Sequence, residues 1–464
     1  MRALPLVVLL ATGLASPAFA KELIVLLANK DTPAAASAEK LAVDGSVFVE
    51  KKLQKALDKV SELLAACPDV EPPRVRNMEP AALTIPADQL CTISLKIAAG
   101  TYLAKGDKVG QVQLDAGYKP NTTVRILGGY ADDFKKREPF TRPTIFPGPL
   151  SIEGKDHAIG EIYISGLVID MGDGNQYDGK TNSLLKGSSS STSALIFGYL
   201  LTNRLVIADN VLLNASRFAS SPLIRARTKQ AQVILRNNFV MNNIQAWQAD
   251  SGGWKNRPAL YLLEGNSFIL NWPYNPDPTT GSAAAVEMKN KDFTAKVVVK
   301  DNLFAFNPGG ALNSWAISEK NSPPTEIKNN LFFGNGSLFG ETAAGAAAMV
   351  VKFGGFKSQE VPWNVISMEL LESDYGWSSA GNQAIDPQLG LTMVKPGFAN
   401  SSGVKAENTV INDVRGMLGM NKQGGKVAIS NFAPRMGFDP ATLPFPKNAA
   451  AQPFGVRAER VEQF

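Results

Sequence analysis

A pattern that recurs about every 28 residues is the feature that most restricts how this 464-residue chain can fold. Its five clearest copies are VIADNVLLN, VILRNNFVMNN, YLLEGNSFILN, VVVKDNLFAFN and TEIKNNLFFGN. The copies share an asparagine, and its spacings of 28, 28, 36 and 28 residues show that one copy carries an eight-residue insertion. Such periods are typical of chains that stack one structural unit per repeat. The shared positions are Asn210, Asn238, Asn266, Asn302 and Asn330.

Apolar residues alternate along each copy, which predicts strands and not helices. The positions three before and two after the shared asparagine are apolar in all five copies, so we expect them to face a core. Asparagine tolerates the left-handed conformation of a tight bend, and equivalent asparagines on stacked coils can form a hydrogen-bonded ladder. We therefore expect such a ladder up the turn. In four copies a second asparagine follows five positions further on, at Asn243, Asn271, Asn307 and Asn335.

Two other repeat architectures fit the pattern less well. Leucine-rich repeats are usually shorter and contain helices, and propeller blades need four antiparallel strands in about 40 residues. The sequence therefore favours a parallel β-solenoid. The segment YISGLVID (163–170) fits one earlier coil if Gly166 takes the place of the asparagine.

The N-terminus predicts export. Residues 1–20, MRALPLVVLLATGLASPAFA, carry one arginine, an apolar stretch and small residues at Ala18 and Ala20, the pattern of a secretory signal peptide. We expect a periplasmic or extracellular protein without a membrane span, because no later stretch has the roughly 18 to 20 apolar residues that a spanning helix needs. Export permits a disulfide between Cys67 and Cys91; the alternative is two small buried apolar side chains.

The rest of the chain divides by its patterning. Residues 21–45 form an N-terminal segment, and apolar residues at helical spacing predict an amphipathic helix over 46–67. We expect the solenoid domain over 46–390, with its clearest coils in 160–340. Residues 391–464 are irregular, and we expect a C-terminal cover there, because the open end of a solenoid would expose unpaired strand edges.

These features resemble the right-handed parallel β-helices of the pectate-lyase-like superfamily, in the form that bacteria export. The strand ending IAAGTY (97–102), the segment ILGGYADDFKKREPFTRPTIF (126–146) and the closing sequence GNQAIDPQL (381–389) are similar to parts of such proteins. The resemblance implies an all-β, right-handed parallel β-helix with an N-terminal capping helix and an irregular C-terminal cover. It also implies three strands per coil, with the asparagine between the second and third.

In related polysaccharide enzymes, the face of the first strands lines the substrate groove. Here the expected first strands include LIRAR (223–227), IQAWQ (244–248) and VEMK (286–289). Alternation turns the charged residues of LIRAR and VEMK outward. Aromatic rings pack on sugars, and guanidinium or ammonium groups bind carboxylates. The alternative is a set of solvated charges on the outside of a solenoid. The candidate groove residues are Arg225, Arg227, Trp247, Glu287, Lys289 and Trp315.

A loop that follows the first clear coil offers a candidate calcium site. Asp170, Asp173, Asn175 and Asp178 carry side-chain oxygens within nine residues, the ligand type that Ca²⁺ prefers. The loop lacks the closing glutamate of an EF-hand, so an ordinary turn-rich loop is the alternative. Apart from Ca²⁺ we expect no cofactor. One histidine, His157, and two cysteines exclude histidine-rich metal sites and thiolate clusters.

The sequence leaves two functions open. A net charge of +5 without a basic run argues against nucleic acid as a partner. One hypothesis is a protein that binds an acidic polysaccharide and modifies it by lyase or epimerase chemistry, with an arginine or lysine as the base. The other is a non-catalytic surface or periplasmic scaffold. The catalytic motifs of polygalacturonases, pectin methylesterases and pectate lyases are absent, so no catalytic residue is carried over from the resemblance.

Overall fold

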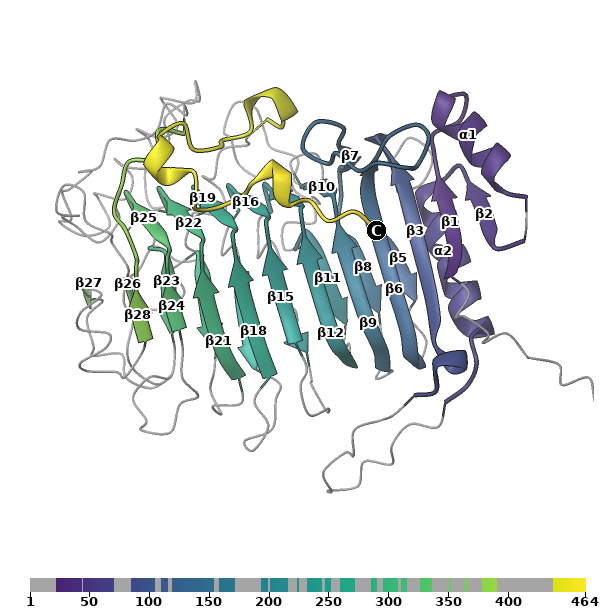
Figure 1. Ribbon diagram of the computed structural model, residues 1–464, viewed down its shortest axis with the longest axis horizontal. Helices are drawn as coiled ribbons and strands as arrows, with labels where there is room; N and C mark the ends of the chain where they lie inside the picture. The colour runs from purple at the N-terminus through teal and green to yellow at the C-terminus, as the bar shows by residue number, and fades with distance from the viewer. Residues whose placement is uncertain are drawn as a thin grey trace, which may run out of the picture.

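The computed structural model describes most of the repeat region and both of its flanks. The described residues are 22–43, 45–70, 85–104, 110–115, 119–153, 158–171, 193–198, 201–215, 223–224, 232–243, 247–251, 259–271, 285–289, 295–307, 310–314, 326–335, 350–351, 364–365, 378–389 and 437–464. The expected signal peptide lies outside them. Strands dominate this part of the chain, and they stack into long parallel sheets (Figure 1).

The longest sheet has eleven strands, all parallel. In spatial order they are β2 (Val47–Glu50), β1 (Glu22–Leu27), β3 (Cys91–Ala98), β6 (Lys119–Tyr130), β9 (Ala158–Ser165), β12 (Leu201–Ala208), β15 (Gln232–Arg236), β18 (Ala259–Glu264), β21 (Ala295–Lys300), β24 (Glu326–Lys328) and β28 (Ser378–Ala380). From β6 to β24, each repeat adds one strand to this sheet.

An eight-stranded sheet collects the short strands that follow the turn. They are β4 (Gly100–Thr101), β7 (Thr144–Phe146), β10 (Leu167–Asp170), β13 (Val211–Leu213), β16 (Phe239–Met241), β19 (Ser267–Ile269), β22 (Leu303–Ala305) and β25 (Leu331–Phe333). Four of these strands, β13, β16, β19 and β22, are buried at every position, so both faces of this part of the sheet are covered.

Two further sheets hold the strands that precede the long ones. One contains β5 (Val112–Asp115), β8 (Leu150–Glu153) and β11 (Leu195–Gly198), and the other contains β14 (Leu223–Ile224), β17 (Trp247–Ser251), β20 (Val286–Lys289) and β23 (Leu312–Ser314). A separate antiparallel pair joins β26 (Val350–Val351) to β27 (Asn364–Val365). The chain thus visits three faces in each repeat, which gives a solenoid-like stack of coils.

The predicted core positions are confirmed. In the register of the long sheet Leu235 pairs with Leu263, which pairs with Val299, so equivalent residues of successive repeats lie side by side. The residues three before the asparagine are buried, as are those two after it, and all belong to one core inside the stack. These residues are Ile207, Leu235, Leu263, Val299, Ile327, Leu212, Val240, Phe268, Phe304 and Phe332.

The turn after the long strand differs in one detail from the expected one. The left-handed conformation belongs to the residue before each shared asparagine, with φ of 58° at Asp209, 56° at Asn237 and 64° at Gly265. These residue types tolerate that conformation, and the shared asparagine is left free to point inward. Gly166 likewise stands in the place of Asp209 and not in that of the asparagine, because the preceding Ser165 pairs with Ala208.

Asparagine ladders are present at both positions of the repeat. Asn210 Nδ2 donates to Asn238 Oδ1 over 2.9 Å, and Asn238 donates to Asn266 over 2.9 Å. The same step continues through Asn302 and Asn330 and ends at Asn382, in the segment that closes the long sheet. The second ladder joins Asn243, Asn271, Asn307 and Asn335 over 2.7 to 3.2 Å.

The N-terminal end begins with two strands that the repeat did not reveal. Strand β1 lies between β2 and β3, ahead of residue 46, and α1 (Pro33–Leu41) connects β1 to β2. The helix expected over 46–67 covers only α2 (Leu53–Ala66); residues 47–50 are strand β2 instead, because the run Val47-Phe48-Val49 favours a strand and pairs with β1.

The two helices pack on opposite faces of the long sheet. Buried α2 residues join Val25 and Leu27 of β1 in the main core, whereas α1 packs with Leu26 and Ala28 in a separate cluster. A disulfide joins Cys67, just after α2, to Cys91 at the start of β3, with 6.0 Å between their Cα atoms. The disulfide therefore ties α2 to the long sheet.

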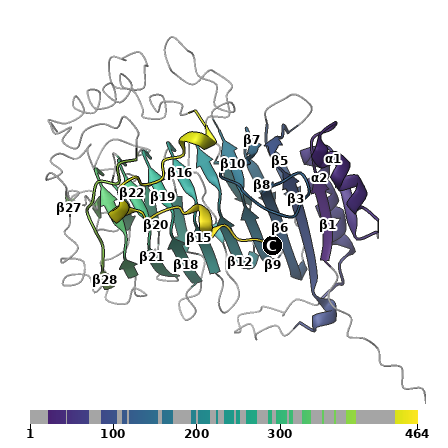
Figure 2. The same cartoon turned by 45° about the horizontal axis from the view of Figure 1, so that its top comes forward.

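The described C-terminal residues cover the side of the stack and not its open end. Residues 437–464 run from β28 back toward β6 (Figures 1 and 2, yellow). Their apolar side chains pack on the outer face of the eight-stranded sheet, where Phe239, Met241 and Leu303 would otherwise meet water. The described part of the expected cover thus lies on the side of the stack, because that sheet is apolar on both faces. Residues 391–436 of the expected cover lie outside the described residues.

Candidate functional site

The four-stranded sheet of β14, β17, β20 and β23 carries the predicted groove positions that the structure describes. In its parallel register Gln248 pairs with Glu287, which pairs with Asn313. Two positions further along the strands Asp250 pairs with Lys289. Paired residues on neighbouring parallel strands are about 4.8 Å apart, so these positions of different coils form two rows along the sheet.

Trp247 occupies another row. It pairs with Val286, which pairs with Leu312, and the side chains of Val286 and Leu312 are fully buried. Strand β17 begins at Trp247, three residues after the expected start of the first strand in that coil. The shift moves Trp247 into the row of Val286 and puts Gln248 beside Glu287. Sequence reasoning therefore missed Gln248, Asp250 and Asn313. Pairing the segments WQADS and VEMK as parallel strands from their first residues would have pointed to Gln248 and Asp250.

Several candidate residues lie outside the described part of the chain. They are Arg225, Arg227, Trp315, Asp173, Asn175, Asp178 and His157. Of the candidate calcium ligands the structure describes Asp170, at the end of β10, which accepts a hydrogen bond from Asn214 Nδ2 over 2.7 Å. Among the described residues no three His, Cys, Asp or Glu side chains gather as a metal-binding group.

The outer face of the eleven-stranded sheet carries ion pairs between neighbouring coils. Lys296 pairs with Glu326 at 2.6 Å, and Lys300 pairs with Glu264 at 2.8 Å. The lysines around Glu326 hold the pKa of its carboxyl group below the ordinary value. These charges are matched within the protein, so this face offers little unpaired charge to a ligand.

Nearer the N-terminus, the same face holds an aromatic residue between two arginines. Tyr163 Oη donates to Glu161 over 2.9 Å and accepts from Arg204 over 3.2 Å. The guanidinium groups of Arg125 and Arg204 lie 5.9 and 5.7 Å from the centre of the Tyr163 ring. Burial, followed by the hydrogen bond to Glu161, raises the pKa of Tyr163, so the phenol stays neutral at physiological pH.

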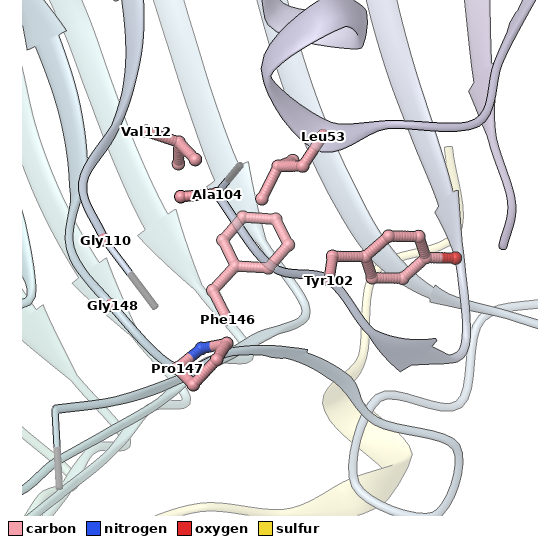
Figure 3. Close-up of a pocket in the computed structure, with 8 residues that line it drawn as sticks. All are labelled: Leu53, Tyr102, Ala104, Gly110, Val112, Phe146, Pro147 and Gly148. Carbon is pink, nitrogen blue, oxygen red and sulfur yellow. The ribbon is translucent and has the colours of Figure 1, made fainter. Parts of the chain in front are cut away.

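A crevice near α2 is too narrow to serve as a ligand site. It lies between α2, β5 and the β7–β8 connection, and it has no room for a water molecule. Figure 3 shows apolar side chains closing it, while the hydroxyl of Tyr102 points away, toward its hydrogen bond with the carbonyl of Ala98. Its lining is Leu53, Tyr102, Ala104, Gly110, Val112, Phe146, Pro147 and Gly148.

Comparisons with known proteins add no identity to this arrangement: no protein-family model matches the chain, and neither a curated protein nor a solved structure matches it significantly. None of the helices in the described ranges is long and apolar enough to cross a membrane. The geometry of the chain itself must therefore carry any functional conclusion.

Proposed function

We propose that this chain is an exported right-handed parallel β-helix of the pectate-lyase-like kind, and that the outer face of the four-stranded sheet binds an acidic polysaccharide. The observation that carries the proposal is the pair of polar rows, Gln248–Glu287–Asn313 and Asp250–Lys289. They alternate with the row of Val286 and Leu312, whose side chains are buried, so the polar rows belong to the outer face.

The other two faces support this choice by contrast. The C-terminal segment covers the eight-stranded sheet, and ion pairs between coils occupy much of the eleven-stranded one. A repeated row of polar groups about 4.8 Å apart suits a linear polymer that runs along the solenoid, because successive sugars meet successive coils. Lys289 would bind uronate carboxylates, as would Arg225 and Arg227 of the predicted first strand 223–227, and amide groups would bind hydroxyls.

Chemistry at this face would be lyase or epimerase chemistry. A basic side chain would remove the proton next to the uronate carboxylate, and the polar row would stabilise the resulting negative charge. In a lyase the electron pair then forms an alkene and expels the neighbouring glycosidic oxygen; in an epimerase a proton returns to the opposite side of the same carbon. A Ca²⁺ ion held near Asp170 would help to bind the carboxylates.

Binding and chemistry are tested with a homopolymeric uronate and the full mature chain, with and without Ca²⁺. We expect Lys289→Ala to weaken binding in calorimetry about tenfold, the loss of one charge-assisted contact. The matched control is Lys300→Ala, a strand lysine on another face whose loss should leave binding unchanged. Proton NMR of the same mixtures distinguishes alkene signals of a lyase from the altered anomeric ratios of an epimerase. Equal binding by both variants would refute the assignment of this face.

The second candidate function is a non-catalytic scaffold. Two asparagine ladders and a stack of phenylalanine rings make the solenoid a stiff support, which favours a role in presenting a surface. Absence of binding to a panel of acidic polysaccharides, together with unchanged NMR spectra, would favour this function over the first.

A further inference from the structure

The last residues of the chain bind along a row of turns in the solenoid. We call residues 454–464 the strap (Figure 2, yellow, ending at C). Its backbone N–H groups donate to successive coils: Gly455 to the carbonyl of Asp301 over 2.8 Å, Val456 to Ser267 Oγ over 3.0 Å, and Arg457 to Asn237 Oδ1 over 2.8 Å. Glu462 N then donates to Asp209 Oδ2 over 3.3 Å. The acceptors form a groove that crosses four coils.

The groove is organised by bonds within the solenoid. Asn237 Nδ2 donates to Asp209 Oδ1 over 2.7 Å, which leaves the other oxygen of Asp209 and the oxygen of Asn237 facing the strap. On the next coil Gly265 leaves space for Arg460, since a Cβ atom at Gly265 would lie 2.7 Å from Arg460 Nη1. The groove therefore matches the shape of the strap as well as its backbone donors.

The end of the strap is bound by a buried arginine. The Arg137 backbone donates to Gln463 Oε1 over 3.0 Å, Gln463 Nε2 donates back to the Arg137 carbonyl over 3.1 Å, and Arg137 Nη1 donates to the Glu462 carbonyl over 2.6 Å. The Phe464 ring lies 5.4 Å from the Arg137 guanidinium and 5.8 Å from the Tyr163 ring. The site thus binds the backbone of Glu462, the amide of Gln463 and the aromatic ring that follows them.

The partners of the strap are distant in sequence: 220 residues separate Arg457 from Asn237, and 326 separate Gln463 from Arg137. No local chain connection therefore holds the strap beside these partners. Two copies have identical turns and identical straps, so a strap can make the same contacts with another copy as with its own chain.

From these contacts we infer that the groove is a peptide-binding site that accepts the strap of a second copy of this chain, so that two copies can exchange their last eleven residues. The inference does not depend on the polysaccharide proposal. The tether favours the strap of the same chain at low concentration, because it keeps the local concentration of that strap high. Exchange should therefore increase with protein concentration, and it should be fastest when two populations are refolded together.

The exchange is tested by cross-linking full-length chains. Arg236 and Glu462 form an ion pair between the solenoid and the strap, and both side chains are about one-third exposed, at 31% and 36%. A copy with Arg236→Cys is refolded together with a differently tagged copy that carries Glu462→Cys, and a short thiol cross-linker is added. We expect a covalent dimer of the two tags. An excess of a synthetic peptide of residues 454–464 should abolish the dimer, and a scrambled peptide should not.

Two controls make the result decisive. The double variant Arg236→Cys/Glu462→Cys should form the cross-link within one chain and stay at the mass of a monomer. This result shows that the variant is folded and that its strap is bound to the solenoid. A mixture of Glu462→Cys with Glu39→Cys, a residue of α1, should give no dimer. The inference is overturned if the double variant cross-links internally while the mixed single variants give no dimer at any concentration. It is equally overturned if the double variant fails to cross-link.

Discussion

Asn238 and Asn266 lie on neighbouring coils with their side chains joined head to tail, Asn238 Nδ2 donating to Asn266 Oδ1 over 2.9 Å. Asn238 also donates to the carbonyls of Ile207 and Arg236, and it accepts from Asn210. All these groups are buried or nearly so. Each asparagine therefore satisfies backbone groups that the turn leaves without partners, and the ladder replaces water inside the turn.

Replacing an inner rung should destabilise the fold strongly. Asn238→Ala leaves several buried donors and acceptors unpaired, at about 1 to 3 kcal/mol each, so we expect the free energy of unfolding to fall by about 3 kcal/mol or more. The matched control is Asn382→Ala at the partly exposed last rung, where water can replace the amide. Urea denaturation of both variants measures the difference. Equal losses would show that the inner rungs carry no special share of the stability.

The stacked phenylalanines predict a second large effect. The rings of Phe268 and Phe304 are 5.0 Å apart and nearly parallel, and Phe332 continues the stack at 5.2 Å. Phe304→Ala removes the middle ring and should cost about 3 to 5 kcal/mol, whereas Phe304→Leu should cost clearly less because it refills most of the space. Thermal unfolding followed by circular dichroism checks the order. A Leu variant as unstable as the Ala variant would argue against cavity formation as the cause.

Two buried tyrosines should respond differently to the loss of their hydroxyl groups. Tyr130 Oη makes no hydrogen bond within the described ranges, whereas Tyr102 Oη donates to the Ala98 carbonyl over 3.0 Å. At neutral pH Tyr130→Phe should therefore be neutral or stabilising, and Tyr102→Phe should cost about 1 kcal/mol. Chemical denaturation of the two variants measures the contrast, and a destabilised Tyr130→Phe protein would contradict it.

Tyr130 also predicts how the stability of the fold responds to alkaline pH. Burial raises the pKa of Tyr130 to about 12, with Arg137 offsetting part of the rise. Because the folded pKa lies above the ordinary value of about 10, the unfolded chain loses its proton first, and stability should fall as pH rises from about 10 to 12. The fall should be shallower in Tyr130→Phe. Melting temperatures across this range provide the test, and parallel curves for both proteins would count against it.

Among the arginines near the end of the strap, we expect Arg137 to contribute most to the stability of the fold. Its guanidinium donates to Gly128, Ser165 and Glu462, and burial lowers its pKa while Asp209 opposes that shift. Arg137→Ala leaves the buried Asp209 carboxylate without its charged neighbour, which should cost about 3 to 5 kcal/mol. Arg142→Ala, at an exposed ion pair with Glu138, should change stability by about 0.5 kcal/mol or less. Denaturation curves that coincide would contradict this assignment.

The repeat made the coils and both ladders predictable. A period of 28 residues with alternating apolar positions determines which side chains enter the core, as Leu235, Leu263 and Val299 show. The cover on the eight-stranded sheet also left a signal: VLL, FVM and LFA are apolar without alternation, as expected for strands buried on both faces. The sequence could thus indicate that this sheet needed a cover.

Which segment covers the eight-stranded sheet, and which residues lie together in the candidate site, were harder to predict from the sequence. No local pattern links Glu462 to Asp209 or Gln463 to Arg137, because these contacts join segments hundreds of residues apart. In the candidate site, a three-residue change in where β17 begins moves Trp247 into the row of Val286 and places Gln248 beside Glu287. Period-2 patterns are sensitive to such shifts, since moving a strand by an odd number of residues reverses its faces.

The strap changes the cooperativity of the molecule. In a simple solenoid each coil touches only its neighbours, so unfolding can start at an end and spread one coil at a time. Here the segment that touches Asp301 also touches Asp209 and Arg137, so coils that share no direct contact gain or lose a common partner together. Fraying of one coil therefore weakens the others, and this region should exchange its amide protons as a single unit.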